Sequence, residues 1–257
     1  MNIDLRLGDC LEVMKTIEDN LIDLILADLP YGTTECKWDS IIPLNELWEQ
    51  YKRILKKTGC IVLTGTQPFT TKLISSNYEM FKYELIWDKV LPTGFANAKY
   101  QPMKQHENIL VFANGKTTYN PQKIKRDKPR KYNRTHKKYE GSENLKGGHD
   151  GKDRVLEYYE PRSIQKFSNA NQKKKVHQTQ KPLPLFEMLV KTYSNEREIV
   201  LDNTIGSGTT AIACINTNRN CIGIEKDVDI YNIAKKRVEE KKEEKNNEPP
   251  TLFNAQR

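Results

Sequence analysis

The sequence lacks the features that mark secreted, membrane-spanning and metal-binding proteins. No apolar run approaches the roughly 20 residues that a bilayer-crossing helix needs. The N-terminal segment MNIDLRLGDC has no basic region followed by an apolar stretch, so we expect no secretory signal and a cytoplasmic protein. Histidines, cysteines and carboxylates do not recur at metal-ligand spacings, so we expect no metal centre.

Cysteine is scarce and scattered along the chain. The five cysteines are Cys10, Cys36, Cys60, Cys214 and Cys221, and no two of them form a CxxC pair. An odd number at these spacings fits neither a disulfide framework nor a zinc knuckle. We therefore expect reduced, buried thiols.

Acidic residues are few in one internal stretch, residues 116–176. It holds 18 Lys and Arg against 7 Asp and Glu, whereas the rest of the chain holds 24 against 27. This asymmetry predicts a nearly neutral body with a basic region that faces a polyanion, and it favours nucleic acid over mere solubility. The densest basic run, predicted to contact phosphates, is Lys125, Arg126, Arg130, Lys131 and Arg134.

Apolar periodicity predicts alternating strands and helices on both sides of this stretch. Strands are expected at 3–7, 21–27, 60–64, 83–90, 109–113, 199–201 and 221–224, and helices at 11–18, 44–57, 69–75, 182–193, 209–216 and 229–242. Residues 114–178 lose this periodicity and predict a loop-rich insert. The alternation implies an α/β, doubly wound, mostly parallel sheet, which binds ligands beyond the carboxyl ends of its strands.

A glycine turn follows the strand at 199–201. Gly206-Ser207-Gly208 leads into a helix at Thr209-Thr210, whose unpaired N–H groups suit a carboxylate or a phosphate. Glu225 ends the next strand, where a carboxylate can accept both ribose hydroxyls. The pattern fits any nucleoside cofactor, including a dinucleotide, and a purely structural turn is the alternative. Asp202 suits a sulfonium or ammonium better than phosphates, which favours S-adenosylmethionine.

A second motif, Asp28-Leu29-Pro30-Tyr31, follows the apolar run LIDLILA. A carboxylate and a fixed backbone carbonyl can accept both hydrogens of an exocyclic amino group, and a tyrosine ring can stack on a base. Two acceptors also localise the nitrogen lone pair for attack on a sulfonium methyl. The motif therefore predicts a catalytic site for a planar base.

Together the two motifs resemble the amino-group DNA methyltransferases (N6-adenine or N4-cytosine) of the β arrangement. That family carries Asp-Pro-Pro-Tyr, and Leu29 stands here for the first proline. Its cofactor motif, Asp-Pro-Phe-x-Gly-Ser-Gly-Thr-Thr, is similar to Asp202 through Thr210, with Asn203 and Thr204 for Pro-Phe. Gly8-Asp9-Cys10 and Thr179-Gln180-Lys181-Pro182 resemble two further cofactor segments.

The resemblance implies a circularly permuted, seven-stranded methyltransferase sheet with an inserted target-recognition lobe. It divides the chain into a catalytic half (1–115), a basic target-recognition region (116–176), a cofactor half (177–243) and a polar tail (244–257). The implied cofactor residues are Asp9, Cys10, Lys181, Asp202, Thr204, Gly206, Ser207, Gly208, Thr209, Thr210, Glu225 and Lys226.

We therefore expect an S-adenosylmethionine-dependent enzyme that flips a base out of double-stranded DNA and methylates it, with adenine N6 favoured over cytosine N4. The resemblance also suggests two protein partners, a second copy of the chain in a homodimer and a cognate restriction endonuclease. RNA and protein-amide methyltransferases share the acceptor geometry. A nicotinamide oxidoreductase would use the Gly206 loop but leaves Asp28–Tyr31 unexplained. A nucleic-acid-binding module with an inactive methyltransferase fold is disfavoured by the intact Asp28 and Tyr31.

Overall fold

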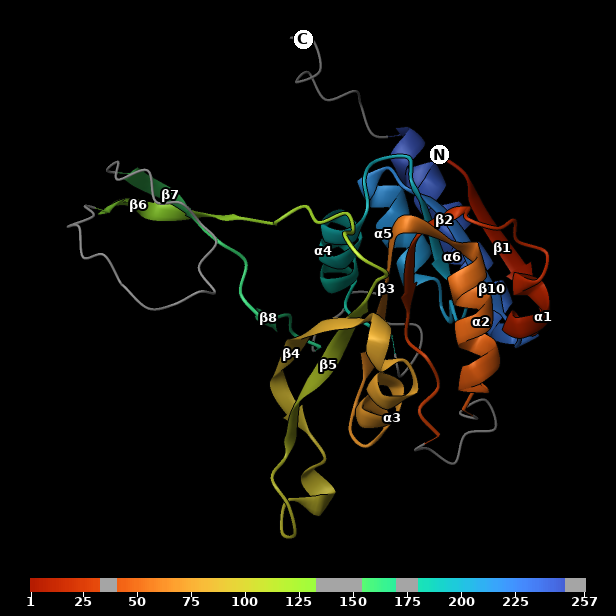
Figure 1. Ribbon diagram of the computed structural model, residues 1–257, viewed down its shortest axis with the longest axis horizontal. Coiled ribbons are helices and arrows are strands. Elements are labelled where there is room, and N and C mark those ends of the chain that lie inside the picture. The colour runs from red at the N-terminus through yellow and green to blue at the C-terminus, as the bar shows by residue number, and fades with distance from the viewer. Residues whose placement is uncertain (33–40, 133–153, 170–179, 248–257) are drawn as a thin grey trace. The chain divides into compact units, whose positions relative to one another are not determined.

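The computed structural model describes residues 1–32, 41–132, 154–169 and 180–247. The chain divides into two compact units, of which the smaller spans Pro121–Arg162 and the larger comprises the rest. The larger unit contains an α/β sheet with its helices, and the smaller unit contains a two-stranded hairpin (Figure 1).

Among the described residues the large sheet has eight strands, one more than the seven predicted. In order across the sheet they are β1 (Ile3–Leu7), β10 (Asn220–Glu225), β9 (Ile199–Asp202), β2 (Ile22–Ala27), β3 (Leu55–Gly65), β5 (Lys104–Phe112), β4 (Phe81–Thr93) and β8 (Ile164–Lys166). Every pairing is parallel except those that β5 makes with β3 and β4. The prediction of a mostly parallel, permuted sheet is confirmed, because the N-terminal strand β1 lies outside the C-terminal strands β9 and β10.

The middle of the sheet is a topological switch point. Strand β2 leads through α2 (Leu44–Ile54) to β3 on one side, and β9 leads through α5 (Thr209–Thr217) to β10 on the other. The two strands lie side by side, with Leu24 opposite Val200 and Ile25 opposite Leu201. Ligands in doubly wound sheets bind where neighbouring connections diverge in this way.

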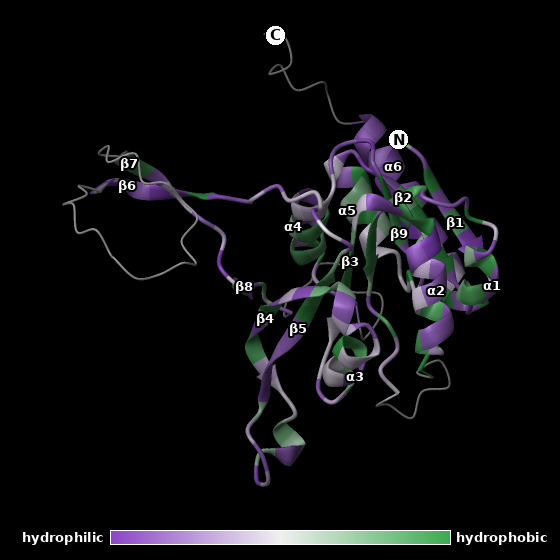
Figure 2. Cartoon of the chain, in the orientation of Figure 1, coloured by the Kyte–Doolittle hydropathy of each residue, from purple (hydrophilic) through white to green (hydrophobic). Residues whose placement is uncertain are grey.

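Two hydrophobic cores, one on each face, hold the sheet between two helical layers. Leu24 and Leu26 of β2 belong to the core that α4 (Leu183–Tyr193), α5 and α6 (Val228–Asn247) cover. Ile25 and Ala27 belong to the core under α1 (Cys10–Met14), α2 and α3 (Phe69–Ser76). Alternate residues of a strand point to opposite faces, so a strand covered on both faces must be apolar throughout. The central strands are accordingly green in Figure 2.

Two predicted helices are shorter in the structure. The helix predicted at 44–57 ends at Ile54, because Leu55 already pairs with Ile22 in the sheet. The helix predicted at 11–18 ends at Met14, although Ile17 is buried in the same core. In both cases tertiary pairing or packing overrides the local helical pattern. No helix among the described ranges is long and apolar enough to span a bilayer.

The insert is more regular than the predicted loops. In the smaller unit β6 (Ile124–Tyr132) pairs antiparallel with β7 (Arg154–Tyr159). The Arg126 guanidinium lies 3.8 Å from the centre of the Tyr159 ring, and its Nε donates to the Tyr158 carbonyl oxygen over 3.1 Å. Strand β8, also inside the predicted insert, joins the large sheet beside β4. The basic sequence of β6 has no apolar alternation, so a pattern search does not detect it.

Candidate active site

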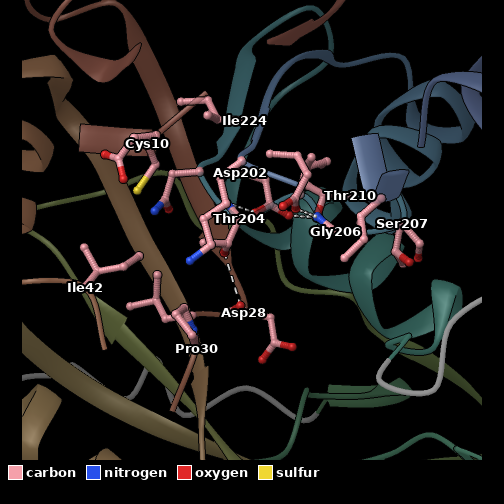
Figure 3. A pocket seen from close by; sticks show the side chains of 18 of the residues that line it. Cys10, Asp28, Pro30, Ile42, Asp202, Thr204, Gly206, Ser207, Thr210 and Ile224 are labelled. Atoms are coloured by element: carbon pink, nitrogen blue, oxygen red, sulfur yellow. Dashed lines mark hydrogen bonds between the residues drawn. The ribbon is translucent and has the colours of Figure 1, made fainter. Parts of the chain in front are cut away.

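A cavity of about 300 Å³ opens at the carboxyl ends of β1, β10, β9 and β2 (Figure 3). It brings together both motifs. The predicted base and cofactor residues that line it are Asp9, Cys10, Asp28, Leu29, Pro30, Tyr31, Lys181, Asp202, Thr204, Gly206, Ser207, Thr209, Thr210, Glu225 and Lys226. Gly208 alone of that set is absent from the lining.

A direct hydrogen bond joins the two motifs. The Thr204 hydroxyl donates to the main-chain carbonyl oxygen of Asp28 over 3.1 Å, a bond drawn dashed in Figure 3. The two residues are 176 positions apart in the chain, yet the β2–β9 pairing places their loops next to each other. The base motif and the cofactor motif therefore face one crevice.

The Asp28 carboxylate is surrounded by three polar groups. Its Oδ1 accepts hydrogen bonds from the Tyr31 hydroxyl, over 2.7 Å, and from the Thr64 hydroxyl. Its Oδ2 lies 2.7 Å from the Lys181 ammonium. A carboxylate has about four lone-pair sites, so these contacts leave room for one more donor.

The environment of Asp28 also determines the protonation of its neighbours. Burial raises the pKa of Tyr31 well above its ordinary value, and the negative charge of Asp28 raises it further, so Tyr31 donates as a neutral phenol. Burial alone would lower the pKa of Lys181, but Asp28, Tyr31 and Glu107 raise it overall, so Lys181 stays a cation. The sequence predicts that Lys181 binds the cofactor. In the structure its ammonium pairs with the Asp28 carboxylate.

Tyr31 is held in place by an aromatic neighbour. The centres of the Tyr31 and Phe69 rings are 5.3 Å apart, at an interplanar angle of 36°. Phe69 is buried at the start of α3 and does not line the cavity. It therefore supports Tyr31 rather than forming a wall of the site.

Asp202 is the buried acid of the cofactor loop. Its carboxylate accepts from the Thr204 N–H over 3.1 Å and from the Thr210 hydroxyl. Burial raises the pKa of Asp202 to about 7, although both hydrogen bonds act in the opposite direction. A cation bound in the cavity would favour its charged form.

Asn203 leaves a buried donor unsatisfied at the cavity wall. Its Oδ1 accepts from the buried Tyr51 hydroxyl over 2.5 Å, which fixes the orientation of the amide. Its Nδ2 has no hydrogen-bond partner among the described residues, and Asn203 is 1% exposed. An orphaned buried donor costs about 1–3 kcal/mol, which an acceptor on a bound ligand would recover.

Two predicted carboxylates have backbone partners in the structure. Glu225 accepts from the Gly206 N–H through Oε2 and from the Asp227 N–H through Oε1, each over 3.0 Å. Asp9 accepts from the Leu11 N–H over 2.9 Å and so caps α1. Both carboxylates shape their loops and retain lone pairs toward the cavity.

The two glycines of the turn, Gly206 and Gly208, have different structural roles. Gly206, at φ +52°, lines the cavity, whereas Gly208, at φ +88°, precedes α5. A Cβ at Gly208 would lie 3.3 Å from the Cβ of Ala234 in α6. Gly208 therefore permits close helix packing behind the loop, and Ser207 is held by Arg237 of α6, which donates to its carbonyl oxygen and hydroxyl.

Sequence reasoning missed Thr64, Glu107 and Asn203 as site residues. Thr64 ends the predicted strand next to Asp28, since Ala27 pairs with Leu63, so the strand-end rule could have found it. Glu107, whose Oε2 lies 3.5 Å from the Lys181 ammonium, is on the antiparallel strand β5 and gives no such signal. The described part of the chain contains no cluster of three His, Cys, Asp or Glu that could hold a metal.

The predicted phosphate contacts belong to the smaller unit. Lys125, Arg130 and Lys131 are exposed on β6, and Arg126 is partly covered by Tyr159. Arg134 lies outside the described residues, as do Cys36 and Thr179.

The doubly wound sheet and the glycine-turn cavity at its switch point define a class of α/β proteins that bind nucleoside ligands. Within that class, the family model for DNA methylases, N6_N4_Mtase, matches residues 22–236. The chain belongs to this family, which confirms the resemblance drawn from Asp28–Tyr31 and Asp202–Thr210.

Individual relatives match over nearly the whole chain. Type II methyltransferase M.HpaI of Haemophilus parainfluenzae is 29% identical over 250 residues, covering 90% of this chain and 73% of that protein. Type II methyltransferase M.BglII of Bacillus subtilis is 30% identical over 269 residues, covering 94% and 70%.

Solved structures share the fold. A complex of M1.HpyAVI with SAM has a TM-score of 0.62 at 24% identity and covers 91% of this chain and 99% of that one. The cytosine-N4-specific PvuII DNA methyltransferase has a TM-score of 0.66 at 13% identity, covering 96% and 92%.

Proposed function

We propose that this protein transfers a methyl group from S-adenosylmethionine to the exocyclic amino group of a base flipped out of double-stranded DNA. The observation that supports this most directly is the shared cavity, in which the Thr204 hydroxyl bonds to the Asp28 carbonyl. An electrophile held by the Asp202–Thr210 loop and an amino group held by the Asp28–Tyr31 loop would meet there. Family membership supports DNA as the substrate.

The residues of the cavity fit S-adenosylmethionine. Asp202 presents a buried carboxylate suited to the ammonium of the cofactor, and Glu225 suits the ribose hydroxyls. The unpartnered Nδ2 of Asn203 offers a donor that a polar ligand can satisfy. Asp9, Cys10 and Lys226 line the end next to β1 and β10, where the resemblance expects the adenine. The bound cofactor supplies an electrophilic methyl group on a sulfonium.

The catalytic loop would orient the target amino group. Asp28 accepts one amino hydrogen, the Leu29 carbonyl accepts the other, and Pro30 keeps the turn rigid. Tyr31 offers its ring to the base. Held in this way, the amino nitrogen would accept the methyl group, the cofactor sulfur would keep the electron pair of the broken carbon–sulfur bond, and the nitrogen would release one proton to solvent. Asp28 acts as a hydrogen-bond acceptor and Lys181 balances its charge.

We infer adenine N6 as the target, since adenine is the commoner target of the arrangement that the chain resembles. Cytosine N4 is the alternative. The basic residues of β6 would contact DNA phosphates, and residues 116–176 would serve target recognition, between a catalytic half (1–115) and a cofactor half (177–243), with 244–257 as a tail. Double-stranded DNA, a second copy of the chain and a cognate restriction endonuclease are the partners proposed.

The test is methyl transfer from labelled S-adenosylmethionine to unmethylated plasmid DNA, followed by nucleoside analysis. We expect N6-methyladenine in the digest and no label with Asp28→Ala. Label in N4-methylcytosine would correct the base. Transfer that survives Asp28→Ala, or no transfer to DNA by the wild-type protein, would contradict the proposed function.

A further inference from the structure

The β4–β5 connection forms an arm, residues 89–104, that carries exposed aromatic and apolar side chains. Phe95 is 82% exposed and Tyr100 is 87% exposed, and Val90 and Leu91 are about half exposed. Among the described residues no aromatic side chain is more exposed than these two. Such a cluster is costly in water and marks an interaction surface.

The arm points beyond the edge of the sheet at which the cavity opens. Strand β4 runs in the same direction as β2 and β3, since both β3 and β4 are antiparallel to β5. Its end at Thr93 therefore extends past the carboxyl edge, and η2 (Phe95–Asn97) lies at the tip (Figure 1). The arm and Asp28 thus lie at the same edge of the sheet, the one formed by the carboxyl ends of the parallel strands.

A row of alternating charges connects the base of the arm to the catalytic carboxylate. Lys181, paired with Asp28, lies 3.5 Å from Glu107 Oε2. Glu107 Oε1 in turn lies 3.4 Å from the Lys89 ammonium, which donates to the Thr93 hydroxyl over 3.3 Å. Lys89 is 6% exposed, so this row is a buried feature of the fold. Displacement of the arm would move Lys89 and, through Glu107 and Lys181, change the charges around Asp28.

The tip is a folded turn that presents its side chains in a defined way. The Asn97 N–H donates to the Gly94 carbonyl over 3.0 Å, and the Tyr100 N–H donates to the Asn97 carbonyl over 2.9 Å. Val90 has φ +67°, a strained conformation for a β-branched residue that is typical of functional segments. These hydrogen bonds hold the tip in one conformation, so its exposed side chains are positioned before a separate molecule binds.

The charge of the arm indicates the ligand. Residues 89–104 include Lys89, Lys99 and Lys104 and no acidic residue, and Lys99 and Lys104 are exposed. Exposed aromatic rings flanked by lysines suit stacked bases beside phosphates. Proteins that distort a duplex insert apolar side chains between base steps in this manner.

We propose that the arm is a DNA wedge, in which Phe95 and Tyr100 stack on bases of the duplex next to the extruded target and thereby stabilise its flipped state. The inference rests on the proposed function, because it requires a base to be flipped. Lys99 and Lys104 bind the neighbouring phosphates. The wedge residues belong to the larger unit, whereas the basic residues of β6 belong to the smaller unit.

The test compares a matched duplex with one that carries a mismatch opposite the target base, once modified-base sequencing has given the methylated site. The double variant Phe95→Ala/Tyr100→Ala should lose about tenfold or more in single-turnover methyl transfer on the matched duplex. It should lose about twofold at most on the mismatched duplex, whose target is already unpaired and cheaper to extrude. Fluorescence of 2-aminopurine at the target should rise with the wild type only.

Tyr78→Ala is the matched control, since Tyr78 is 74% exposed but precedes the amino end of β4. It should match the wild type on both duplexes. Phe95→Trp/Tyr100→Phe keeps both rings and should keep the matched-duplex rate. Binding of S-adenosylhomocysteine should be the same in all variants, which shows that the cavity is folded.

Equal losses on both duplexes, or no loss on either, would overturn the wedge. A change in oligomeric mass of the double variant by light scattering would also overturn it, because the tip would then contact a second copy of the chain. A wild-type protein that methylates no DNA would instead refute the proposed function itself. The two failures are therefore distinguishable.

Discussion

The ammonium of Lys181 lies 2.7 Å from Oδ2 of Asp28, so the carboxylate of the Asp28–Tyr31 loop has its counter-charge in a segment 153 positions further along the chain. Lys181 also lies 5.8 Å from the centre of the Tyr31 ring. One cation therefore lies close to both the Asp28 carboxylate, the proposed acceptor, and the Tyr31 ring, the proposed stacking surface.

We expect Lys181→Met to slow methyl transfer by about tenfold or more, because it leaves the Asp28 carboxylate without the cation that lies 2.7 Å from its Oδ2. Lys181→Arg keeps the charge and should keep most of the rate. The measurement is single-turnover methyl transfer at saturating S-adenosylmethionine. A wild-type rate with Lys181→Met would show that the ion pair does not act on the carboxylate.

Asp28→Asn should reduce methyl transfer by about a hundredfold or more, since the amide keeps the shape but loses the anionic acceptor for the amino hydrogen. Affinity for S-adenosylhomocysteine, measured by calorimetry, should change little because the cofactor loop is untouched. Asp19→Asn is a suitable control, as Asp19 is an exposed carboxylate paired with Arg53. Comparable rates for Asp28→Asn and Asp19→Asn would contradict the assigned role.

Thr204→Val should slow methyl transfer by about threefold to tenfold, because it removes one neutral hydrogen bond, to the Asp28 carbonyl, at nearly constant volume. Thr204→Ser keeps the hydroxyl and should restore most of the rate. If the bond positions the catalytic loop, the loss appears in kcat and leaves cofactor affinity close to the wild type. A loss confined to cofactor affinity would make Thr204 a binding residue only.

Cofactor affinity should fall as pH drops below about 7. Burial raises the pKa of Asp202 to about 7 in the ligand-free protein, so the folded state holds this proton more tightly than the unfolded chain. The protonated Asp202 therefore stabilises the folded state relative to the unfolded chain. This contribution is fully present below the ordinary pKa of 3.8 and is lost as pH rises through 7. A bound ammonium favours the carboxylate, so binding releases the proton.

The predicted loss of affinity is about tenfold between pH 8 and pH 6, as expected when one proton must leave a group of pKa near 7. Calorimetry of S-adenosylhomocysteine in buffers with different ionisation enthalpies would count the released proton. Asp202→Asn should bind more weakly and without this pH dependence. A wild-type affinity that is flat across this range would refute the assignment of Asp202 to the ammonium.

The basic residues of β6 should contribute to DNA affinity through counterion release. Replacing Lys125, Arg130 and Lys131 by Gln should lower the slope of log Kd against log salt by roughly one unit for each phosphate that the variant no longer neutralises. Fluorescence anisotropy with duplex DNA at several salt concentrations measures the slope. Lys235→Gln/Lys236→Gln on the exposed face of α6 is the control and should leave it unchanged.

The meeting of Asp28 and Asp202 could be predicted from the sequence because both follow apolar strands, and parallel strands expose their carboxyl ends on one edge. The same rule places Thr64 next to Asp28. It does not predict the ion pair with Lys181, which reaches Asp28 from a loop that no local pattern locates. Strand β8 has three residues without apolar alternation, and only its pairing with β4 makes it a strand. The end of α2 was missed for the same reason.

The order of the strands has a consequence for folding. Strands β9 and β10 come after β2, β3, β4, β5 and β8 in the chain, yet they lie between β1 and β2 in the sheet. Without residues 199–225 the sheet has a gap at its centre, and β1 has no strand to pair with among the described residues. The pairings that close the sheet join strands far apart in the sequence, and such long-range pairings form slowly.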